Sequence, residues 1–414
     1  MIRRIERIFL LTVFLIISLS VSAQEGAYGA YSPYSIYGIG DISKEGSAFT
    51  KSMGGVGIAT RNRRFINYTN PAAITARDTL SFMADFGLEQ KNTVYRQGDI
   101  RSANNTFNIH NFVMSFPIWR SSAFMVGITP YSDVGYDFSS IETDKDIIGN
   151  TGNISYDSFG TGSVYKTFIG AGATFWKRLS VGAEMIYYFG NINKRTEMNY
   201  SDDSFRSVNA GNELALRGVT GKFGLQYDQK LGGDVSMILG ATYRMGTDVK
   251  GYSTSYRYAV QSGVVDTLKH HIDTLGAGKI GFADEIGVGL SVRGGEKWMI
   301  EFDYLRSNWS KSGFEIVPNR NDVRYYFKRC TYRAGFYYDQ SYYKLDGNNV
   351  NSMGITFGMT LPIAPLSRIH NAVTLGVDLG QRASTRNNMI RERYARFVVS
   401  FNIHDIWFQK MQYN

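Results

Sequence analysis

The stretch VTLGVDLG, residues 373–380, alternates large apolar side chains with threonine, glycine or aspartate at every second position. Side chains on an extended chain point alternately to opposite faces, so this stretch predicts a strand with one apolar face and one face of small or polar side chains. The same alternation recurs in residues 286–292, 354–361 and 396–403. The sequence therefore predicts a protein built of repeated β-strands.

Two all-β architectures alternate in this way. The outward face of a soluble β-sandwich is rich in Lys, Glu and Thr, whereas here the second face is rich in glycine with isolated charges such as Glu184, Lys222 and Asp303. Aromatic clusters stand toward segment ends, as in residues 187–189 and 325–327, where the girdles of a membrane barrel lie. The pattern favours an all-β fold, a transmembrane antiparallel β-barrel.

The alternating segments predict about 14 strands, and residues 310–317 are the least regular of them. They lie near residues 80–95, 106–119, 122–133, 160–176, 179–193, 213–229, 234–250, 281–293, 297–308, 310–317, 323–339, 352–361, 372–382 and 393–403. Most connections at one end are short, and residues 139–158, 194–212 and 251–279 read as long polar loops. Short turns belong in the periplasm and long loops outside the cell.

The N-terminus has the layout of a signal peptide. Arg3, Arg4 and Arg7 precede an apolar run over residues 8–19, and small residues lead to Ala23. The run of about a dozen residues is too short to cross a bilayer as a helix. We expect cleavage between Ala23 and Gln24 and, since no cysteine follows, no lipid anchor.

Composition excludes several classes of protein. Glycine accounts for 44 of 414 residues and proline for 7, and Cys330 is the single cysteine, which rules out an internal disulfide or a thiolate metal cluster. The formal net charge is +9. Because a signal peptide takes the chain away from nucleic acid, we expect the counter-charges to be outer-membrane lipid headgroups and lipopolysaccharide phosphates.

A segment without alternation precedes the first strand. It contains 31-YSPYSIYGIGD-41, 52-SMGGVGIA-59 and 70-NPAA-73, in which glycines permit close backbone packing and Asn-Pro sets a turn. A compact irregular segment of this size is suited to plug a barrel. The predicted organisation is a signal peptide (1–23), an N-terminal hatch (24–78) with the Asn70 turn near the centre of the lumen, and a barrel (79–414).

At these residues the chain resembles, as a divergent member, the FadL and TodX type of outer-membrane transporter for hydrophobic compounds. That family carries an MGGxG stretch followed by NPA in an N-terminal hatch, and Met53, Gly54, Gly55 and Gly57, then Asn70, Pro71 and Ala72, stand in that order here. Residues 332–341 look like a late strand of the family. The resemblance covers most of the mature chain, but its sharp motifs are confined to these three places.

The resemblance implies a multi-pass barrel of a Gram-negative outer membrane that takes up a hydrophobic small molecule, fatty-acid-like or aromatic, passively past the hatch. The family's ligand-contacting residues have no recognisable counterpart here, so the resemblance does not identify the ligand of this chain. The alternative is a FadL-like scaffold subunit of an outer-membrane secretion or barrel-assembly complex, whose loops bind other outer-membrane proteins.

Catalytic motifs give no support for an enzyme. His270 and His271, with Asp266 and Asp273 nearby, could suggest a metal site, but adjacent side chains on an extended chain point apart. Serine lies in no nucleophile-elbow context, and residues 54–57 match neither a P-loop nor a dinucleotide fingerprint. We therefore predict no catalytic residue, no metal and no cofactor.

Overall fold

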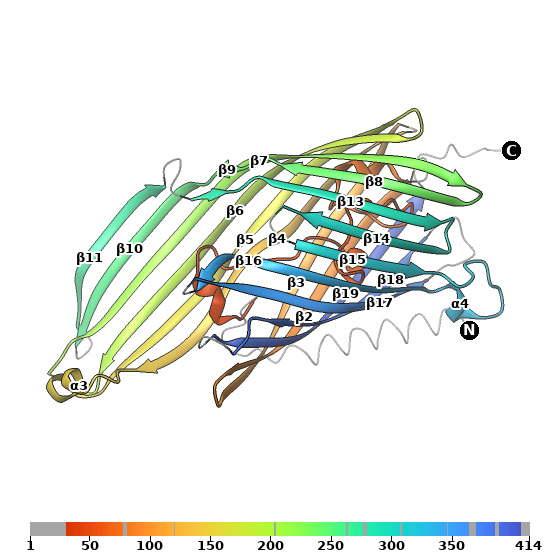
Figure 1. Cartoon of the computed structure of the whole chain (residues 1–414). Helices are drawn as coiled ribbons and strands as arrows, with labels where there is room; N and C mark the ends of the chain where they lie inside the picture. Colours follow the sequence, from red (N-terminus) through yellow and green to blue (C-terminus); the bar gives the residue numbers. More distant parts are fainter. Residues whose placement is uncertain are drawn as a thin grey trace, which may run out of the picture.

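The computed structural model describes ten stretches of the chain, from Ala30 to Ile406 (Figure 1). They are residues 30–77, 81–119, 121–202, 204–261, 264–275, 280–306, 309–345, 347–363, 370–385 and 389–406. The predicted signal peptide and its cleavage site at Ala23 and Gln24 lie outside them. Within these stretches, no helix combines the length and apolar character needed to span a bilayer.

Fourteen antiparallel strands form the barrel, seven before and seven after a projecting hairpin. The first seven are β2 (Ser81–Gln97), β3 (Ile100–Trp119), β4 (Ser122–Ile141), β5 (Ile154–Phe175), β6 (Leu179–Tyr200), β7 (Ser207–Gly232) and β8 (Val235–Arg244). The second seven are β13 (Glu285–Gly294), β14 (Trp298–Leu305), β15 (Trp309–Ile316), β16 (Thr331–Leu345), β17 (Asn348–Pro362), β18 (Ala372–Arg382) and β19 (Arg391–Ile406).

The sheet closes on itself. Strand β19 pairs with β2 along its length, and β8 pairs with β13, so no barrel strand is left at an edge. The predicted barrel of about 14 strands is confirmed, including residues 310–317, which form β15.

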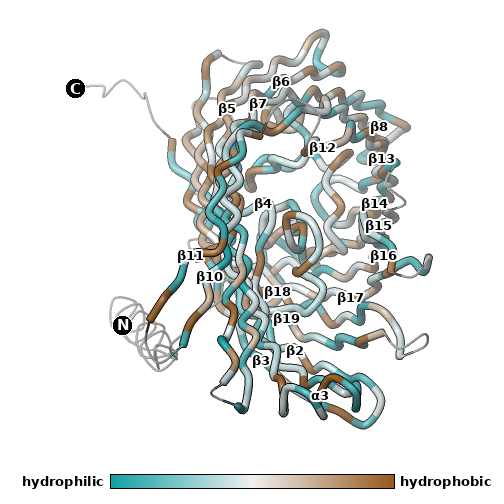
Figure 2. Tube along the Cα trace, turned by 90° about the vertical axis from the view of Figure 1, so that its left-hand side faces the viewer, coloured by the Kyte–Doolittle hydropathy of each residue, from teal (hydrophilic) through white to brown (hydrophobic). Residues whose placement is uncertain are grey.

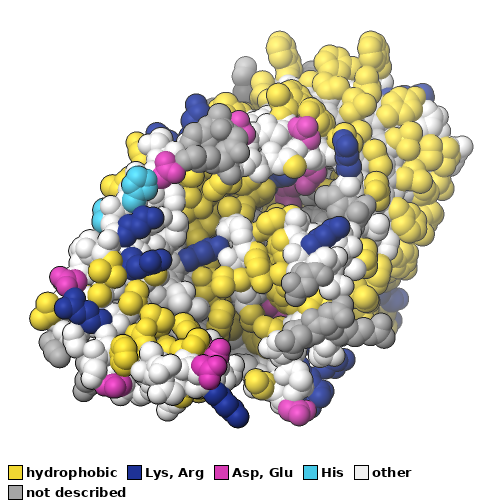
Figure 3. All heavy atoms as spheres, turned by 60° about the vertical axis from the view of Figure 1, so that its left-hand side comes forward, with side chains coloured by type: hydrophobic (Ala, Val, Ile, Leu, Met, Phe, Trp, Pro, Cys, Tyr) yellow, Lys and Arg dark blue, Asp and Glu magenta, His cyan; other side chains and the backbone are white. Residues whose placement is uncertain are grey.

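The alternation correctly identifies the two faces of the wall. Leu375 on β18 is 38% exposed and points outward, whereas its neighbour Thr374 is 1% exposed and points inward. The same holds on β14, where Phe302 is exposed between the buried Glu301 and Asp303. Hydrophobic side chains cover one side of the barrel in Figure 3, which is the surface that hydrocarbon would contact.

One side of the barrel continues far beyond the rest. Strands β5 and β6 have 22 residues each and β7 has 26, whereas β14 and β15 have 8. Figure 1 shows these long strands sweeping away from the barrel beside the hairpin. We call this extension the wing; it comprises residues 154–164, 190–200 and 207–217, α3 (Lys145–Thr151), β10 (Lys250–Gln261) and β11 (Val264–Leu275).

The wing corrects the predicted long loops. Within residues 139–158, α3 lies between the end of β4 and the start of β5, and the described residues of 194–212 and 251–279 are mostly strand, in β6, β7, β10 and β11. The side chains on both faces of β11 are exposed up to residue 274, so this strand lacks the apolar alternation that revealed the others. The predicted strand at 323–339 is also wrong at its start, because α4 (Tyr326–Arg329) precedes β16.

The N-terminal segment, residues 30–77, lies against the inner face of the wall. Its turns are red to orange in Figure 1, and Figure 2 shows chain segments inside the ring of strands. It contains η1 (Pro33–Ile36), β1 (Asp41–Ile42), α2 (Ala48–Lys51) and η2 (Pro71–Thr75). Strand β1 pairs with Ser132 and Asp133 of β4. A two-stranded ladder of β9 (Thr247–Asp248) and β12 (Gly281–Phe282) stands where the wing hairpin joins the barrel.

Candidate functional site

A row of glycines on the inner wall receives the N-terminal segment. A Cβ atom added at Gly335 would collide with the backbone of Gly54, and one added at Gly182 would collide with that of Pro71. Because glycine has no side chain, backbone can approach backbone at these positions. The row has one glycine on each of nine strands, β5 to β8, β13 and β15 to β18: Gly172, Gly182, Gly224, Gly240, Gly289, Gly313, Gly335, Gly358 and Gly376.

The first sequence motif lies across β15 to β17. Gly54 and Gly55 have φ angles of +73° and +81°, in the left-handed region that favours glycine. This conformation directs the backbone N–H of Gly54 to the hydroxyl of Thr356, at 2.7 Å. Met53 is fully buried against Gly313. The segment thus reaches the wall through backbone atoms.

The motif then places its backbone amides over two carboxylates of β14. The amides of Gly57 and Ile58 donate to Asp303 at 2.7 and 3.0 Å, and that of Ala59 donates to Glu301 at 2.9 Å. The hydroxyl of Thr60 also donates to Glu301. Both carboxylates are buried, so these donors supply hydrogen bonds that water would otherwise give.

The second motif meets the first. The side chain of Asn70 caps η2 by accepting from the amide of Ala72 at 3.0 Å, and its Nδ2 donates to the carbonyl of Ile58 at 2.7 Å. Pro71 packs over Gly182 and Gly224. The prediction that this turn occupies the centre of the lumen is not what the structure has, because Asn70 lies against β7 and β8, near the carbonyls of Leu225 and Ala241.

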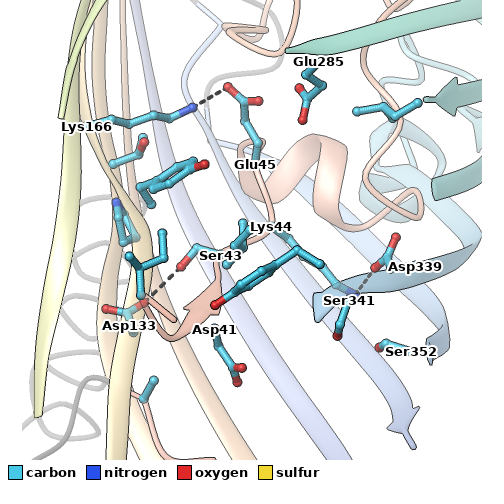
Figure 4. A pocket seen from close by; sticks show the side chains of 18 of the residues that line it. Asp41, Ser43, Lys44, Glu45, Asp133, Lys166, Glu285, Asp339, Ser341 and Ser352 are labelled. Atoms are coloured by element: carbon cyan, nitrogen blue, oxygen red, sulfur yellow. Dashed lines mark hydrogen bonds and ion pairs between the residues drawn. The ribbon is translucent and has the colours of Figure 1, made fainter. Parts of the chain in front are cut away.

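Ion pairs join the segment to the wall nearer the wing. Glu45 receives Lys166 at 2.6 Å and Lys222 at 3.1 Å. Lys51 donates to Glu89 at 2.7 Å, and its Nζ lies 2.9 Å from Nδ1 of His110. Figure 4 shows Glu45 and Lys44 projecting from the segment toward wall side chains.

The charge state of Glu45 follows from these neighbours. Burial by itself raises the pKa of a carboxyl group, but the charges of Lys166 and Lys222 outweigh burial and hold the pKa of Glu45 well below its usual range. The carboxylate is therefore ionised at neutral pH and acts as the counter-ion of two buried ammonium groups.

Sequence reasoning identified inward charges such as Glu184, Lys222 and Asp303 but did not predict their partners. The detectable signal is a charged residue at an inward position of an alternating strand, since such a side chain needs a partner inside the barrel. Which residue of the N-terminal segment supplies that partner depends on contacts far apart in sequence.

A cavity of about 670 Å³ lies between the segment and the wall (Figure 4). Apolar and aromatic side chains such as Ile39, Tyr131 and Phe282 line part of it. The rest of its lining is polar or charged, and several of the charges form ion pairs, among them Arg244 with Glu285 at 3.4 Å. The cavity therefore combines apolar surface with polar groups and ion pairs.

Two groups that sequence analysis considered lie apart from this lining. His270 and His271 are exposed on β11, opposite Tyr256 and Ser255 of β10. Among the described residues, no three His, Cys, Asp or Glu side chains gather as they would around a metal ion. Cys330 is a free thiol, buried where α4 ends.

We compared the chain with protein families, curated proteins and solved structures. A family model described as BamG matches residues 1–414, and no curated protein matches the sequence. The toluene transporter TodX of Pseudomonas putida superposes with a TM-score of 0.61 at 16% identity, covering 89% of this chain and 99% of that one. The monoaromatic hydrocarbon channel CymD gives 0.57 at 13% identity, covering 86% and 97%.

A Pseudomonas aeruginosa FadL homologue has a TM-score of 0.53 at 9% identity, covering 89% of this chain and 99% of its own. At these identities the likeness concerns the fold. The resemblance inferred from residues 53–57, 70–72 and 332–341 is confirmed at that level, since the chain has the FadL-type barrel of 14 strands.

Proposed function

The chain belongs to the BamG family, and from that premise we propose that it is a closed outer-membrane barrel that serves as a structural subunit of an outer-membrane protein assembly. In this role the N-terminal segment keeps the barrel closed, and the wing is the surface that other proteins bind. The proposal rests on the many contacts of the N-terminal segment with the wall, which include hydrogen bonds to strands β7, β14 and β17.

A plug that must stay in place needs contacts that are costly to break. Backbone amides buried on Asp303 and Glu301, and close packing on the glycine row, meet that need. Each buried donor left without an acceptor costs about 1–3 kcal/mol. We assign residues 24–78 to the plug, with Met53, Gly54, Gly55, Gly57, Asn70, Pro71 and Ala72 as its anchoring residues.

The wing supports a protein-binding role. A tilted strand needs about 9–11 residues to cross the hydrocarbon core, so roughly half of the 26 residues of β7 stand outside it. On β11, Val264, Leu268 and Ile272 are each more than half exposed. Apolar side chains displayed on an extension outside the membrane favour contact with another protein.

The outer membrane is the environment that suits this chain. The FadL-type fold and the apolar outer face fit a Gram-negative outer membrane, and a cleaved signal peptide would deliver the chain there. Lipid and lipopolysaccharide are then its surroundings. The short turns would face the periplasm and the wing the cell exterior.

A second candidate function is passive uptake of a hydrophobic small molecule. The solved structures with this fold are described as hydrocarbon channels and a toluene transporter, and the cavity of about 670 Å³ has apolar walls such as Tyr131 and Phe282. It ranks second because the same cavity is lined by buried ion pairs such as Glu45 with Lys166. A hydrocarbon gains about 0.8 kcal/mol for each CH₂ removed from water, but it leaves neighbouring charges poorly solvated.

Site-specific crosslinking separates the two functions. A photo-crosslinking residue at Leu268 on the wing should join a discrete outer-membrane protein in intact cells, whereas the same residue at Asn349, on the hairpin between β16 and β17, should not. Mass spectrometry of the barrel purified in mild detergent should find that partner in stoichiometric amount. A lipid-like or aromatic ligand in the lumen with no crosslink at Leu268 would favour uptake.

A further inference from the structure

The four charged residues of the N-terminal segment between Ala30 and Lys51 are Asp41, Lys44, Glu45 and Lys51. Each is paired with a charge on the wall. We call residues 30–51 the arm and residues 52–77 the base. The arm carries no net charge, whereas the charged residues of the base are all arginines.

The partner of Glu45 has a second carboxylate beside it on the wall. Lys222 of β7 stands directly opposite Glu184 of β6 in the strand register. Both carboxylate oxygens of Glu184 are buried, and neither has a hydrogen-bond partner among the described residues. Glu184 is therefore in position to accept Lys222 when Glu45 is not there.

The partner of Asp41 is arranged in the same way. Arg382 of β18 contacts Asp41 at 2.7 Å, and Glu392 of β19 lies 3.7 Å from the same guanidinium. Oε2 of Glu392 is buried and accepts no hydrogen bond from the described residues. Glu392 is thus a second carboxylate near Arg382, the cation that Asp41 of the arm now binds.

The two lysines of the arm repeat the arrangement with the signs reversed. Lys44 lies 3.7 Å from Asp378, and Lys51 lies 2.7 Å from Glu89. Arg396 of β19 contacts both carboxylates, Glu89 at 3.1 Å and Asp378 at 3.7 Å. Both carboxylates keep a wall cation if the arm departs.

This duplication matters because a buried charge without a counter-charge is strongly destabilising. The charges of the arm contact six wall charges, namely Lys166, Lys222, Arg382, Glu89, Asp378 and Asp339. If each depended on the arm alone, detachment would leave all six without a counter-charge. With Glu184, Glu392 and Arg396 present, detachment exchanges ion pairs for five of these six charges, and the sixth, Asp339, lines the cavity. The arm's other bonds to the wall include the pairing of β1 with β4 and the amides of Ser32 and Ser43 on the carbonyls of Gly135 and Tyr131. Water can bind these backbone groups of β4 once the arm has left.

The base has no such substitutes. The amides of Gly57, Ile58 and Ala59 are held by Asp303 and Glu301, and the glycine row leaves no room for water behind them. Its contacts are backbone contacts that the wall cannot make with itself.

From this contrast we propose that the plug has two parts, an arm at residues 30–51 that detaches from the wall toward the wing by exchange of ion pairs, and a base at residues 52–77 that remains and keeps the barrel closed. The proposal rests on the plug role argued above and concerns how that plug is regulated. Detachment places the arm on the side of the molecule that bears the wing, without opening a path through the barrel.

Cysteine labelling tests the two parts separately. In a Cys330→Ser background, Ser47→Cys reports on the arm and Ala73→Cys on the base, because both positions are buried. The purified full-length barrel in liposomes is treated with a bulky, membrane-impermeant maleimide. We expect Ser47→Cys to be labelled at a measurable rate while Ala73→Cys stays unlabelled and small-solute flux does not rise.

The substitutes are tested by removing them. Glu184→Gln and Glu392→Gln, each combined with Ser47→Cys, should slow labelling roughly ten-fold or more, since the detached state then leaves a cation unpaired. Asp284→Asn is the matched control, a cavity carboxylate whose hydrogen-bond partners are Gly246 and Tyr243, and should not change the rate. Glu184→Asp should restore it.

Unchanged labelling in both glutamine variants, or equal labelling of Ser47→Cys and Ala73→Cys, would overturn the two-part plug. Labelling that is accompanied by solute flux would also overturn it, because the base would then be leaving with the arm. If the proposed structural role is wrong, no partner will be crosslinked at Leu268. That result is independent of the labelling rates of Ser47→Cys and Ala73→Cys.

Discussion

The backbone amide of Gly57 donates a hydrogen bond of 2.7 Å to the carboxylate of Asp303, which projects inward from the middle of β14. One partner comes from a glycine motif and the other from an inward position of an alternating strand, 246 residues apart. The bond explains why the motif needs backbone that can approach a wall and why the wall carries a buried carboxylate there. The first prediction concerns this bond.

Asp303→Ala should destabilise the barrel because it removes the acceptor of both Gly57 and Ile58. Two buried amides without acceptors cost roughly 2–6 kcal/mol together. The measurement is the temperature at which the folded, fast-migrating gel band is lost. Asp234→Ala, at an exposed turn between β7 and β8, should leave that temperature unchanged; equal effects of the two substitutions would contradict the role of Asp303.

Gly335→Ala should displace the N-terminal segment, since the new methyl group would overlap the backbone of Met53 and Gly54. Neither partner is a flexible side chain that could move aside. We expect increased protease cleavage within residues 30–77 and leakage of small solutes through the inserted barrel. Gly149→Ala in α3 is the control, because nothing lies within 4 Å of its added Cβ. A Gly335→Ala barrel that stays protected and tight would show that the glycine row is not required.

Much of this fold is readable from the sequence because the membrane enforces it. Leu375 and Thr374 point to opposite faces of β18. Because the outer face of the wall meets hydrocarbon and the inner face is packed, apolar side chains recur at every second position of such a strand. The motifs at residues 53–57 and 70–72 are also readable, since positive φ and an Asn-Pro turn require particular residues.

The wing and the ion pairs are not readable in the same way. Along β11 the side chains on both faces are exposed up to residue 274, so the strand has no apolar period and its sequence resembles that of a loop. The pairing of Glu45 with Lys166 joins residues 121 apart, and nothing near either residue specifies the other. Such contacts are decided by how the closed barrel places its inward rows against the segment.

The facing of β3 gives a direct test of membrane placement. Ile109 is 54% exposed on the outer face, at the height of Leu88 and Val399, whereas the adjacent Asn108 lines the cavity. Ile109→Lys should cost about 2–4 kcal/mol near the middle of the bilayer, while Asn108→Lys should cost much less. The free energy of unfolding from lipid vesicles measures both. If the two lysines are tolerated equally, the outer face of β3 is not in hydrocarbon.

Substitutions of two members of the cluster around Glu45 should differ in how much they lower the stability of the barrel. Glu45→Gln leaves Lys166 and Lys222 with Glu184, so the loss of stability should be small. Lys222→Met leaves two buried carboxylates facing Lys166, and an uncompensated buried charge costs about 3–5 kcal/mol. Thermal unfolding at neutral pH should therefore rank Lys222→Met well below Glu45→Gln, and the reverse order would contradict Glu184 as a substitute partner.

The pH dependence of the same cluster follows from the depressed pKa of Glu45. A carboxyl group with a folded pKa below its unfolded value of about 4.3 contributes stability that is fully present above that value and is lost as pH falls through the folded pKa. The stability difference between wild type and Glu45→Gln should thus be constant from neutral pH down to about pH 5 and shrink only in stronger acid. A difference that disappears already near neutral pH would mean that Lys166 and Lys222 do not hold this carboxylate.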